Sequence, residues 1–194
     1  MANDKTIWDF LKAKGLTDYA AAGVMGNLNA ESGLRPDNLQ NSYEKKLGYT
    51  DAEYTAAVDN GSYTNFVHDS AGYGLAQWTF WSLKQGLLDY AKAAGESIGS
   101  LNMQLNYLYS ELKRTILTDL QKATSVRQAS DIMLTRYERP ADQSEAVQVR
   151  RAGYGQEYYN KYAKESEVKT MIRMTHVYVK KNNVICGITS VESN

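Results

Sequence analysis

The sequence predicts a mainly α-helical protein with a small loop and β region and a short C-terminal β-hairpin, an α+β fold dominated by helices. Apolar residues recur at the 3.6-residue spacing of amphipathic helices through much of residues 4–30 and 82–162. Residues 32–81 are instead rich in Gly, Asn, Asp, Ser and Tyr and show no long period. Clusters of β-branched residues follow residue 171, where the helical spacing ends.

Two helices are predicted at the start of the chain. Asp4 is expected to cap a short helix that ends near Gly15 and buries Ile7, Trp8 and Leu11. Thr17 is expected to cap a second helix that runs to about Ala30. The apolar residues of this second helix follow the i, i+3, i+4, i+7 pattern of one buried face: Ala21, Val24, Met25 and Leu28.

One short helix is predicted inside the irregular region and four more after it. Thr50 and Glu53 form a capping box for a helix over 51–58, and the rest of the region reads as loops with a small hairpin. The clearest apolar stripe belongs to a core helix and comprises Leu101, Leu105, Leu108, Leu112 and Ile116. The other three helices are expected to open with the capping pairs Ser82 and Gln85, Ser125 and Gln128, and Asp142 and Glu145.

The chain is predicted to divide near residue 164 into a helical domain, residues 1–163, and an appendage, residues 164–194. A charged linker over 164–167 is expected to lead into a hairpin over 171–188, with its turn at Lys181, Asn182 and Asn183. Because a lone hairpin is marginally stable in water, we expect this segment to self-associate or to begin a further, partner-binding domain.

The composition argues against several classes of function. The 22 Lys and Arg balance 22 Asp and Glu among 194 residues, and nucleic-acid-binding proteins usually carry a basic excess. No run approaches the ~18 apolar residues of a membrane span, and residues 1–5 lack the apolar stretch of a secretory signal. With two His and the single Cys186, a His/Cys zinc site is not expected. No dinucleotide or phosphate-loop fingerprint occurs, and we expect no cofactor and no metal.

Glu31 is the first candidate for chemistry. It continues the spacing of Val24 and Leu28, which predicts a carboxyl that points inward at the end of the second helix. Partial burial and the negative end of the helix dipole both favour the protonated acid there. A carboxylic acid kept protonated near neutral pH is what a glycosidase needs to protonate a leaving oxygen. The alternative is a glutamate in a fraying last turn that faces solvent.

A second candidate site lies in residues 68–79. His68 and Asp69 precede two glycines that bracket Tyr73, and glycines allow a sharp turn or a close approach of backbone to ligand. Gln77 and Trp78 then pair a planar amide with a large aromatic face, which suits sugar hydroxyls and the apolar face of a sugar. The alternative is a turn built around a core tryptophan.

Two other chemistries are weaker. Neighbouring residues such as His68, Asp69 and Ser70 cannot form a hydrolase triad, and no nucleophile elbow is present. Cys186 with His176 is a poor thiol-hydrolase pair, because Cys186 falls in an expected strand rather than at a helix N-terminus.

Three segments together resemble the phage tail lysozyme family of the lysozyme superfamily, which is related to goose-type lysozymes. The segment 27–34, Asn-Leu-Asn-Ala-Glu-Ser-Gly-Leu, resembles the superfamily's catalytic-glutamate segment. The segment 72–79, Gly-Tyr-Gly-Leu-Ala-Gln-Trp-Thr, followed by 87–91, resembles this family in particular. The segment 136–140, Arg-Tyr-Glu-Arg-Pro, resembles its later aromatic-Glu-x-Pro element. The likeness covers residues 5–162.

The resemblance implies a lysozyme-like helical fold and a peptidoglycan hydrolase that cleaves the β-1,4 bond between N-acetylmuramic acid and N-acetylglucosamine. Glu31 matches the general acid, and Asp69 is the motif-associated acid for a second catalytic role, with Asp37 and Asp59 as runners-up. His68, Tyr73, Gln77 and Trp78 are the expected substrate-binding residues. A lytic transglycosylase or a non-catalytic tail module are the alternatives. The resemblance further implies a phage-encoded endolysin or tail lysin that binds bacterial peptidoglycan, in which residues 164–194 would begin a wall-binding domain. Charge balance and hydropathy, as above, predict no nucleic-acid or membrane partner.

Overall fold

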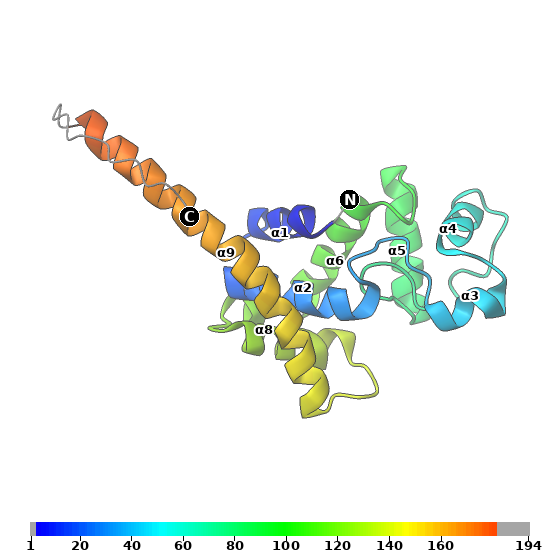
Figure 1. The fold of residues 1–194 in the computed structure, drawn as a ribbon. Helices are drawn as coiled ribbons and strands as arrows, with labels where there is room; N and C mark the ends of the chain where they lie inside the picture. Colours follow the sequence, from blue (N-terminus) through cyan, green and yellow to red (C-terminus); the bar gives the residue numbers. More distant parts are fainter. Residues whose placement is uncertain (1–2, 182–194) are drawn as a thin grey trace.

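The computed structural model describes the backbone of residues 3–181 and the side chains of residues 3–163. This part of the chain is almost entirely helical, as Figure 1 shows. Its helices, in chain order, are α1 (Asp4–Ala13), α2 (Asp18–Ser32), α3 (Asn41–Leu47), α4 (Asp51–Asp59), α5 (Trp81–Ala94), α6 (Leu101–Thr115), α7 (Leu117–Gln121), α8 (Val126–Ile132), the π-helix η1 (Met133–Glu138) and α9 (Glu145–Lys181). The prediction of a mainly helical fold is confirmed.

Helix α2 lies at the centre of the core and packs against α1, α8, η1 and α9. The expected stripe on this helix is buried, but so is every residue from Ala20 to Leu28. Small residues make this possible, because a helix buried on all sides needs neighbours that approach closely. The sequence pattern of one buried face therefore understates how central this helix is.

Glycines set the distance between α2 and α9. A Cβ added to Gly26 would lie 2.4 Å from the carbonyl oxygen of Arg151 and 2.6 Å from the backbone nitrogen of Gly155. A Cβ added to Gly155 would in turn lie 2.7 Å from the carbonyl oxygen of Ala22. The two backbones are in direct contact, and this contact brings Arg151 to the C-terminal end of α2.

Gly26→Ala is expected to lower the free energy of unfolding by at least about 1–3 kcal/mol, because backbone atoms cannot move aside without separating two helices. Gly153→Ala on α9 is the matched control. A Cβ at Gly153 meets nothing within 4 Å, so alanine there should stabilise the helix by about 0.5–1 kcal/mol. Urea unfolding of both variants measures the difference; equal effects of the two substitutions would contradict the close contact.

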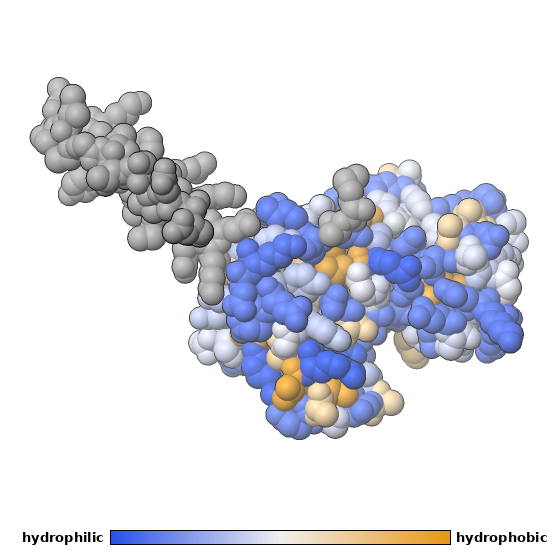
Figure 2. All heavy atoms as spheres, in the orientation of Figure 1, coloured by the Kyte–Doolittle hydropathy of each residue, from blue (hydrophilic) through white to orange (hydrophobic). Residues whose placement is uncertain are grey.

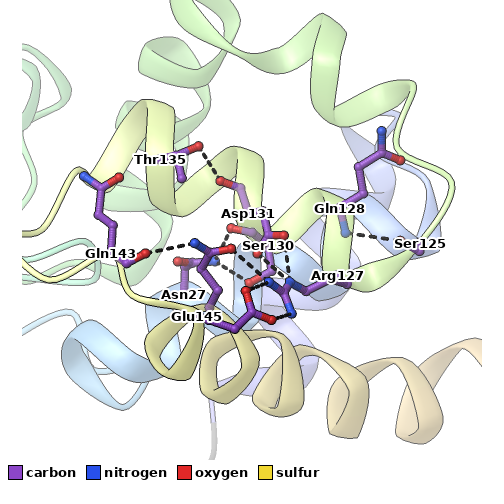
Figure 3. Close-up of polar contacts among 10 residues, drawn as sticks. Asn27, Ser125, Arg127, Gln128, Ser130, Asp131, Thr135, Gln143 and Glu145 are labelled. Carbon is purple, nitrogen blue, oxygen red and sulfur yellow. Dashed lines mark hydrogen bonds and ion pairs between the residues drawn. The ribbon is translucent and has the colours of Figure 1, made fainter.

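A polar network joins α8 to the start of α9 (Figure 3). The Nε of Arg127 donates to the Oδ2 of Asp131 at 2.7 Å, and its two terminal nitrogens donate to Glu145 at 2.9 and 3.0 Å. Bidentate pairs of this kind impose geometry as well as attraction. Arg127 thus holds the first residue of α9, Glu145, against α8. This contact helps to position Arg151, which lies six residues further along α9.

Several predicted helix starts are confirmed and others are wrong. Thr17, Ser125 and the Thr50–Glu53 capping box cap their helices as expected. Asp4 does not cap α1: the N-cap is Asn3, and Asp4 is paired with Lys161 at 2.6 Å. The capping pair at Ser82 is also wrong, because α5 already begins at Trp81 with Phe80 as its N-cap. Glu145 is held by Arg127 instead of forming the expected box with Asp142.

The irregular region holds one more helix than expected, α3, and a small set of β-bridges. Tyr73 forms antiparallel bridges with Leu39 and with Trp78. A Cβ on Gly74, whose φ is +77°, would lie 2.7 Å from the amide of Gln104. The buried Gln104 accepts a hydrogen bond from the backbone nitrogen of Leu75 at 2.9 Å, so it anchors this tight loop from α6.

The predicted hairpin over 171–188 is wrong where the structure describes it, because α9 continues through residues 171–181 and crosses the predicted boundary at 164 without a break. Residues 182–188 lie outside the described residues. No proline occurs in the sequence from 141 onward, and β-branched residues disfavour a helix only weakly, so nothing local stops α9 at the charged segment. Self-association through 171–188 stays a prediction.

The described surface in Figure 2 is mostly polar, with small apolar patches. Among the described residues, no helix combines the length and the apolar character that crossing a membrane requires.

Candidate active site

Glu31 lies one residue before the end of α2, where Gly33 closes the helix in the left-handed conformation with a φ of +63°. Its side chain is 19% exposed. Ser32 next to it donates a hydrogen bond to the carbonyl oxygen of Leu75 at 2.9 Å, which ties the helix end to the 72–79 loop. The expectation that Glu31 points inward from the end of this helix is confirmed.

Arg151 of α9 is the ionic partner of Glu31. Its Nη2 lies 2.6 Å from the Oε1 of Glu31, and its Nη1 donates to the Oδ1 of Asn27 at 3.2 Å. The amide nitrogen of Asn27 is itself bound to the carbonyl oxygens of Gly23 and Ser130, as Figure 3 shows for Ser130. This buried chain of contacts fixes the guanidinium beside Glu31.

A second carboxyl, that of Glu138, reaches the same place from η1. A π-helix is a rare feature that often marks functional sites, because the extra residue per turn redirects side chains. Here Glu138 is the last residue of the π-helix, and the C-cap residue Arg139 has a φ of +48°. Burial raises the pKa of Glu138 well above its ordinary value, and the nearby charge of Glu31 raises it further, while Arg151 opposes the shift.

Glu31 and Glu138 line one hollow of about 480 Å³, together with Gln77, Trp78 and Tyr137. A second hollow of about 400 Å³ shares Glu31, Gln40 and Gln77 with it. On the other side, a third of about 500 Å³ shares Thr79 and Phe80 with the first. The shared lining residues show that the three hollows adjoin; we call the three together the cleft, and Glu31 lines two of them.

Gln77 and Trp78 both line this cleft, but each is held by the protein. The Nε2 of Gln77 donates to the carbonyl oxygen of Asn38 at 2.9 Å, and Gln77 has a φ of +46°, a strained conformation of the kind that concentrates at active sites. The Nε1 of Trp78 donates to the hydroxyl oxygen of Tyr137 at 3.0 Å. Gln77 is thus a half-buried wall residue in a fixed geometry, whereas Trp78 is only 2% exposed, and its buried ring favours the alternative of a turn built around a core tryptophan.

Tyr73 lies away from the cleft surface. Its side chain is fully buried against Tyr54 and Phe66, and its hydroxyl is within hydrogen-bond distance of the Thr55 hydroxyl at 2.5 Å. Burial accordingly raises the pKa of Tyr73 above its ordinary value. A sugar cannot reach this ring without opening the core, so the contacts favour a packing role over the predicted binding role.

Asp69 is also placed outside the hollow that contains Glu31. Its carboxylate is 1% exposed and lies 2.5 Å from the Nζ of Lys84, which is fully buried. Tyr54 donates to it as well, Tyr63 donates at 3.1 Å, and burial together with the charge of Asp69 raises the pKa of Tyr63 to about 12. Burial lowers the pKa of Lys84, and the hydrogen bond that Lys84 donates to Asp69 opposes that shift. The arrangement favours a structural role for Asp69.

His68 lies at the far end of the cleft, in the third hollow. Its ring stacks on Trp81 with 6.5 Å between centroids, and Phe80 and Trp81 are 63% and 54% exposed. These exposed aromatic faces form an open end suited to sugar rings. The runner-up Asp59 instead accepts a hydrogen bond from the backbone nitrogen of Ile98 at 2.9 Å, and neither it nor Asp37 lines any of the three hollows.

Two residues of the site were not among the sequence candidates: Glu138 and Arg151. The quoted segment 136–140 contains Glu138, and its carboxyl beside a proline-terminated helix was the available indication. Arg151 sits in a polar stretch of α9 and had none, because only the packing of α9 on α2 brings it to Glu31. Within the part of the chain whose side chains are described, no group of three or more His, Cys, Asp or Glu could hold a metal ion.

The described part of the chain is thus a helical protein with a cleft lined by two carboxyls, one of which is ion-paired with an arginine. A family model described as phage tail lysozyme matches residues 2–162, and the chain belongs to that family. Membership supports a peptidoglycan-degrading activity of the lysozyme kind, in a phage protein that acts on the bacterial cell wall.

Proposed function

We propose that the protein is a muramidase: a glycoside hydrolase that cleaves the β-1,4 bond between N-acetylmuramic acid and N-acetylglucosamine, with Glu31 as the general acid. The observation that carries this proposal is that Glu31 lines two adjoining hollows of the cleft. A glycan strand laid along the cleft passes the carboxyl with sugars on both sides of it, which is what cleavage within a polymer needs.

The walls of the cleft suit a polysaccharide. The amide groups of Gln40 and Gln77 and the hydroxyl of Thr79 make this hollow polar, and each is oriented by hydrogen bonds within the protein. Phe80 and Trp81 offer apolar faces at the open end, where rings of successive sugars can stack. Shape and polarity together support a chain of amino sugars rather than a small apolar ligand.

Glu31 would protonate the oxygen of the leaving sugar while the bond to the anomeric carbon breaks. A water molecule then completes hydrolysis and leaves a reducing end. If the 6-hydroxyl of the muramic acid attacks instead, the enzyme is a lytic transglycosylase and the product is an anhydro sugar that lacks one water. Glu31 can act as the acid in both reactions. Whether water or the 6-hydroxyl attacks therefore decides whether the enzyme is a hydrolase or a transglycosylase.

We expect the purified protein to clear a suspension of bacterial cell walls and to release muropeptides with reducing ends. Mass spectrometry of the products in water enriched in ¹⁸O gives the class: hydrolysis adds one labelled oxygen per cut, and transglycosylation yields unlabelled anhydro products. Release of only anhydro products would replace the hydrolase with the transglycosylase. Absence of any cleavage by folded protein, with walls still bound, would instead indicate a non-catalytic wall-binding module.

A further inference from the structure

Two buried polar atoms at the cleft have no hydrogen-bond partner among residues 3–163: the Oε1 of Glu138 and the Nε of Arg151. Buried polar groups are normally paired, so an unpaired carboxyl oxygen and an unpaired guanidinium nitrogen at one site call for an explanation. The cleft as proposed above uses Glu31 alone for chemistry and assigns neither of these groups a task.

The two groups belong to one cluster with Glu31. Arg151 is ion-paired with Glu31 at 2.6 Å, and Glu138 lines the same hollow as Glu31. Asn27 holds the guanidinium from the other side at 3.2 Å, so Arg151 cannot turn away. On η1, the residue before Glu138 is fixed by the hydrogen bond between Trp78 and Tyr137, which holds the end of the π-helix against the wall of the cleft.

Charges on the neighbouring helices are paired with one another. Helix α6 contributes Glu111, which forms an ion pair with Arg114. Helix α8 contributes Asp131, which forms an ion pair with Arg127. The charges that act on the Glu138 carboxyl are those of Glu31 from α2 and Arg151 from α9.

We propose that Glu138 is a positioning residue for Glu31: the two carboxyls and Arg151 form one cluster that holds a single proton, and this shared proton is the one that Glu31 delivers to the leaving oxygen. The inference rests on the proposed role of Glu31 as general acid. It assigns Glu138 the task of keeping a proton within the cluster at neutral pH.

The charge count explains why one proton is retained. With one proton on the two carboxyls, the cluster with Arg151 is neutral; without it, two partly buried carboxylates face one guanidinium. Like charges in a shared site disfavour the second ionisation, and such a pair titrates as a unit. Without the Glu138 carboxyl, Glu31 and Arg151 form a neutral ion pair, and no proton is needed to balance the charge of the cluster.

The proton count also balances over a turnover. In the free enzyme the ion pair places the charge on Glu31 and the proton on Glu138. A bound glycan covers the exposed part of Glu31 and removes the water around its charge, which favours transfer of the proton to Glu31. Glu31 then gives it to the leaving oxygen, Arg151 stabilises the carboxylate that results, and the proton lost by the incoming hydroxyl group restores the cluster.

The rate of wall lysis against pH tests the proposal. Glu138→Gln keeps the shape of the side chain but removes the second carboxyl, and it should move the alkaline limb of the profile to lower pH by at least one unit. At a pH on the falling alkaline side of the profile, a shift of one unit makes the variant about tenfold slower than the wild type. Arg151→Met removes the cation and should move the limb to higher pH, and Glu138→Asp should restore most of the wild-type profile. Glu157→Gln on the outside of α9 should not move it.

Two readouts do not depend on activity. Carboxyl ¹³C shifts of glutamate-labelled wild-type protein should show one glutamate that stays protonated at pH 7. Above pH 4.5, the ordinary pKa of glutamate, the unfolded wild-type chain releases a proton that the folded protein keeps. The unfolding constant of the wild type, divided by that of Glu138→Gln, should therefore rise about tenfold per pH unit until the folded protein also releases this proton. The labelling experiment remains decisive even if the variants fold poorly.

The outcomes separate this inference from the proposed function. If Glu31→Gln is inactive while Glu138→Gln leaves the pH profile unchanged, or if no glutamate stays protonated at pH 7, the shared proton is overturned and the general acid stands. If Glu31→Gln keeps wild-type activity, the proposed function fails. A Glu138→Gln protein that is only less stable, with an unmoved alkaline limb, would show that Glu138 is merely structural.

Discussion

Glu31→Gln is expected to lower the rate of wall lysis by about 10²–10⁴-fold, the usual loss when a general acid is removed. The substitution keeps the size of the side chain and one oxygen for Arg151, but the amide has no proton that it can transfer. Because Glu31 lies at the surface of the cleft rather than deep in the core, the fold should survive the change. Turbidity measurements on purified cell walls give the rate.

Glu157→Gln is the matched control, since it removes the same type of carboxylate from an exposed position on α9. It should lyse walls at the wild-type rate. Both variants need circular dichroism spectra that match the wild type. A folded Glu31→Gln protein that is as active as the control would show that the acid is another group.

Asp69→Asn is expected to lower the free energy of unfolding by about 3–5 kcal/mol, because it leaves the fully buried ammonium of Lys84 without its counter-charge. The activity per folded molecule at low temperature should stay near the wild-type value, since Asp69 lies outside the hollow that Glu31 lines. The double variant Asp69→Asn with Lys84→Met should regain part of the lost stability, because it removes the uncompensated charge as well.

Asp9→Asn serves as the control for this pair of variants. Asp9 forms an exposed ion pair with Lys5, and such surface pairs contribute at most about 1 kcal/mol. Urea unfolding measures stability, and the wall assay measures activity on the same samples. If Asp69→Asn melts like the wild type yet loses 10² or more of its activity, Asp69 acts in the chemistry as the sequence motif suggests.

The sequence predicts helices well where a local pattern controls them. The stripe from Leu101 to Leu112 and the cap at Thr17 depend on neighbours three or four residues away, and both are confirmed. The same local spacing places Glu31 correctly at the inner end of α2. Local patterns fail at α9, where clusters of β-branched residues suggest strands but the helix continues to Lys181.

The rest of the site depends on contacts between distant parts of the chain. Arg151 meets Asn27 across 124 residues, and only the glycines on α2 and α9 make that approach possible. The pKa of Glu138 is shifted by burial and by the charges of Glu31 on α2 and Arg151 on α9. No pattern in the residues next to Glu138 in the sequence could predict that shift. Tyr73 and Asp69 show the converse: their motif is conspicuous in the sequence, but their side chains turn into the core.

The most direct measurement of the central claim is a crystal structure of the Glu31→Gln protein with a peptidoglycan tetrasaccharide. The account predicts sugars along the three adjoining hollows, with one glycosidic oxygen within about 2.6–3.2 Å of the side chain at position 31. It also predicts contacts from the exposed rings of Phe80 and Trp81 to the sugars on one side of that bond. A tetrasaccharide bound in the cleft with no glycosidic oxygen near position 31, or bound elsewhere on the protein, would contradict the assignment of Glu31 as the acid.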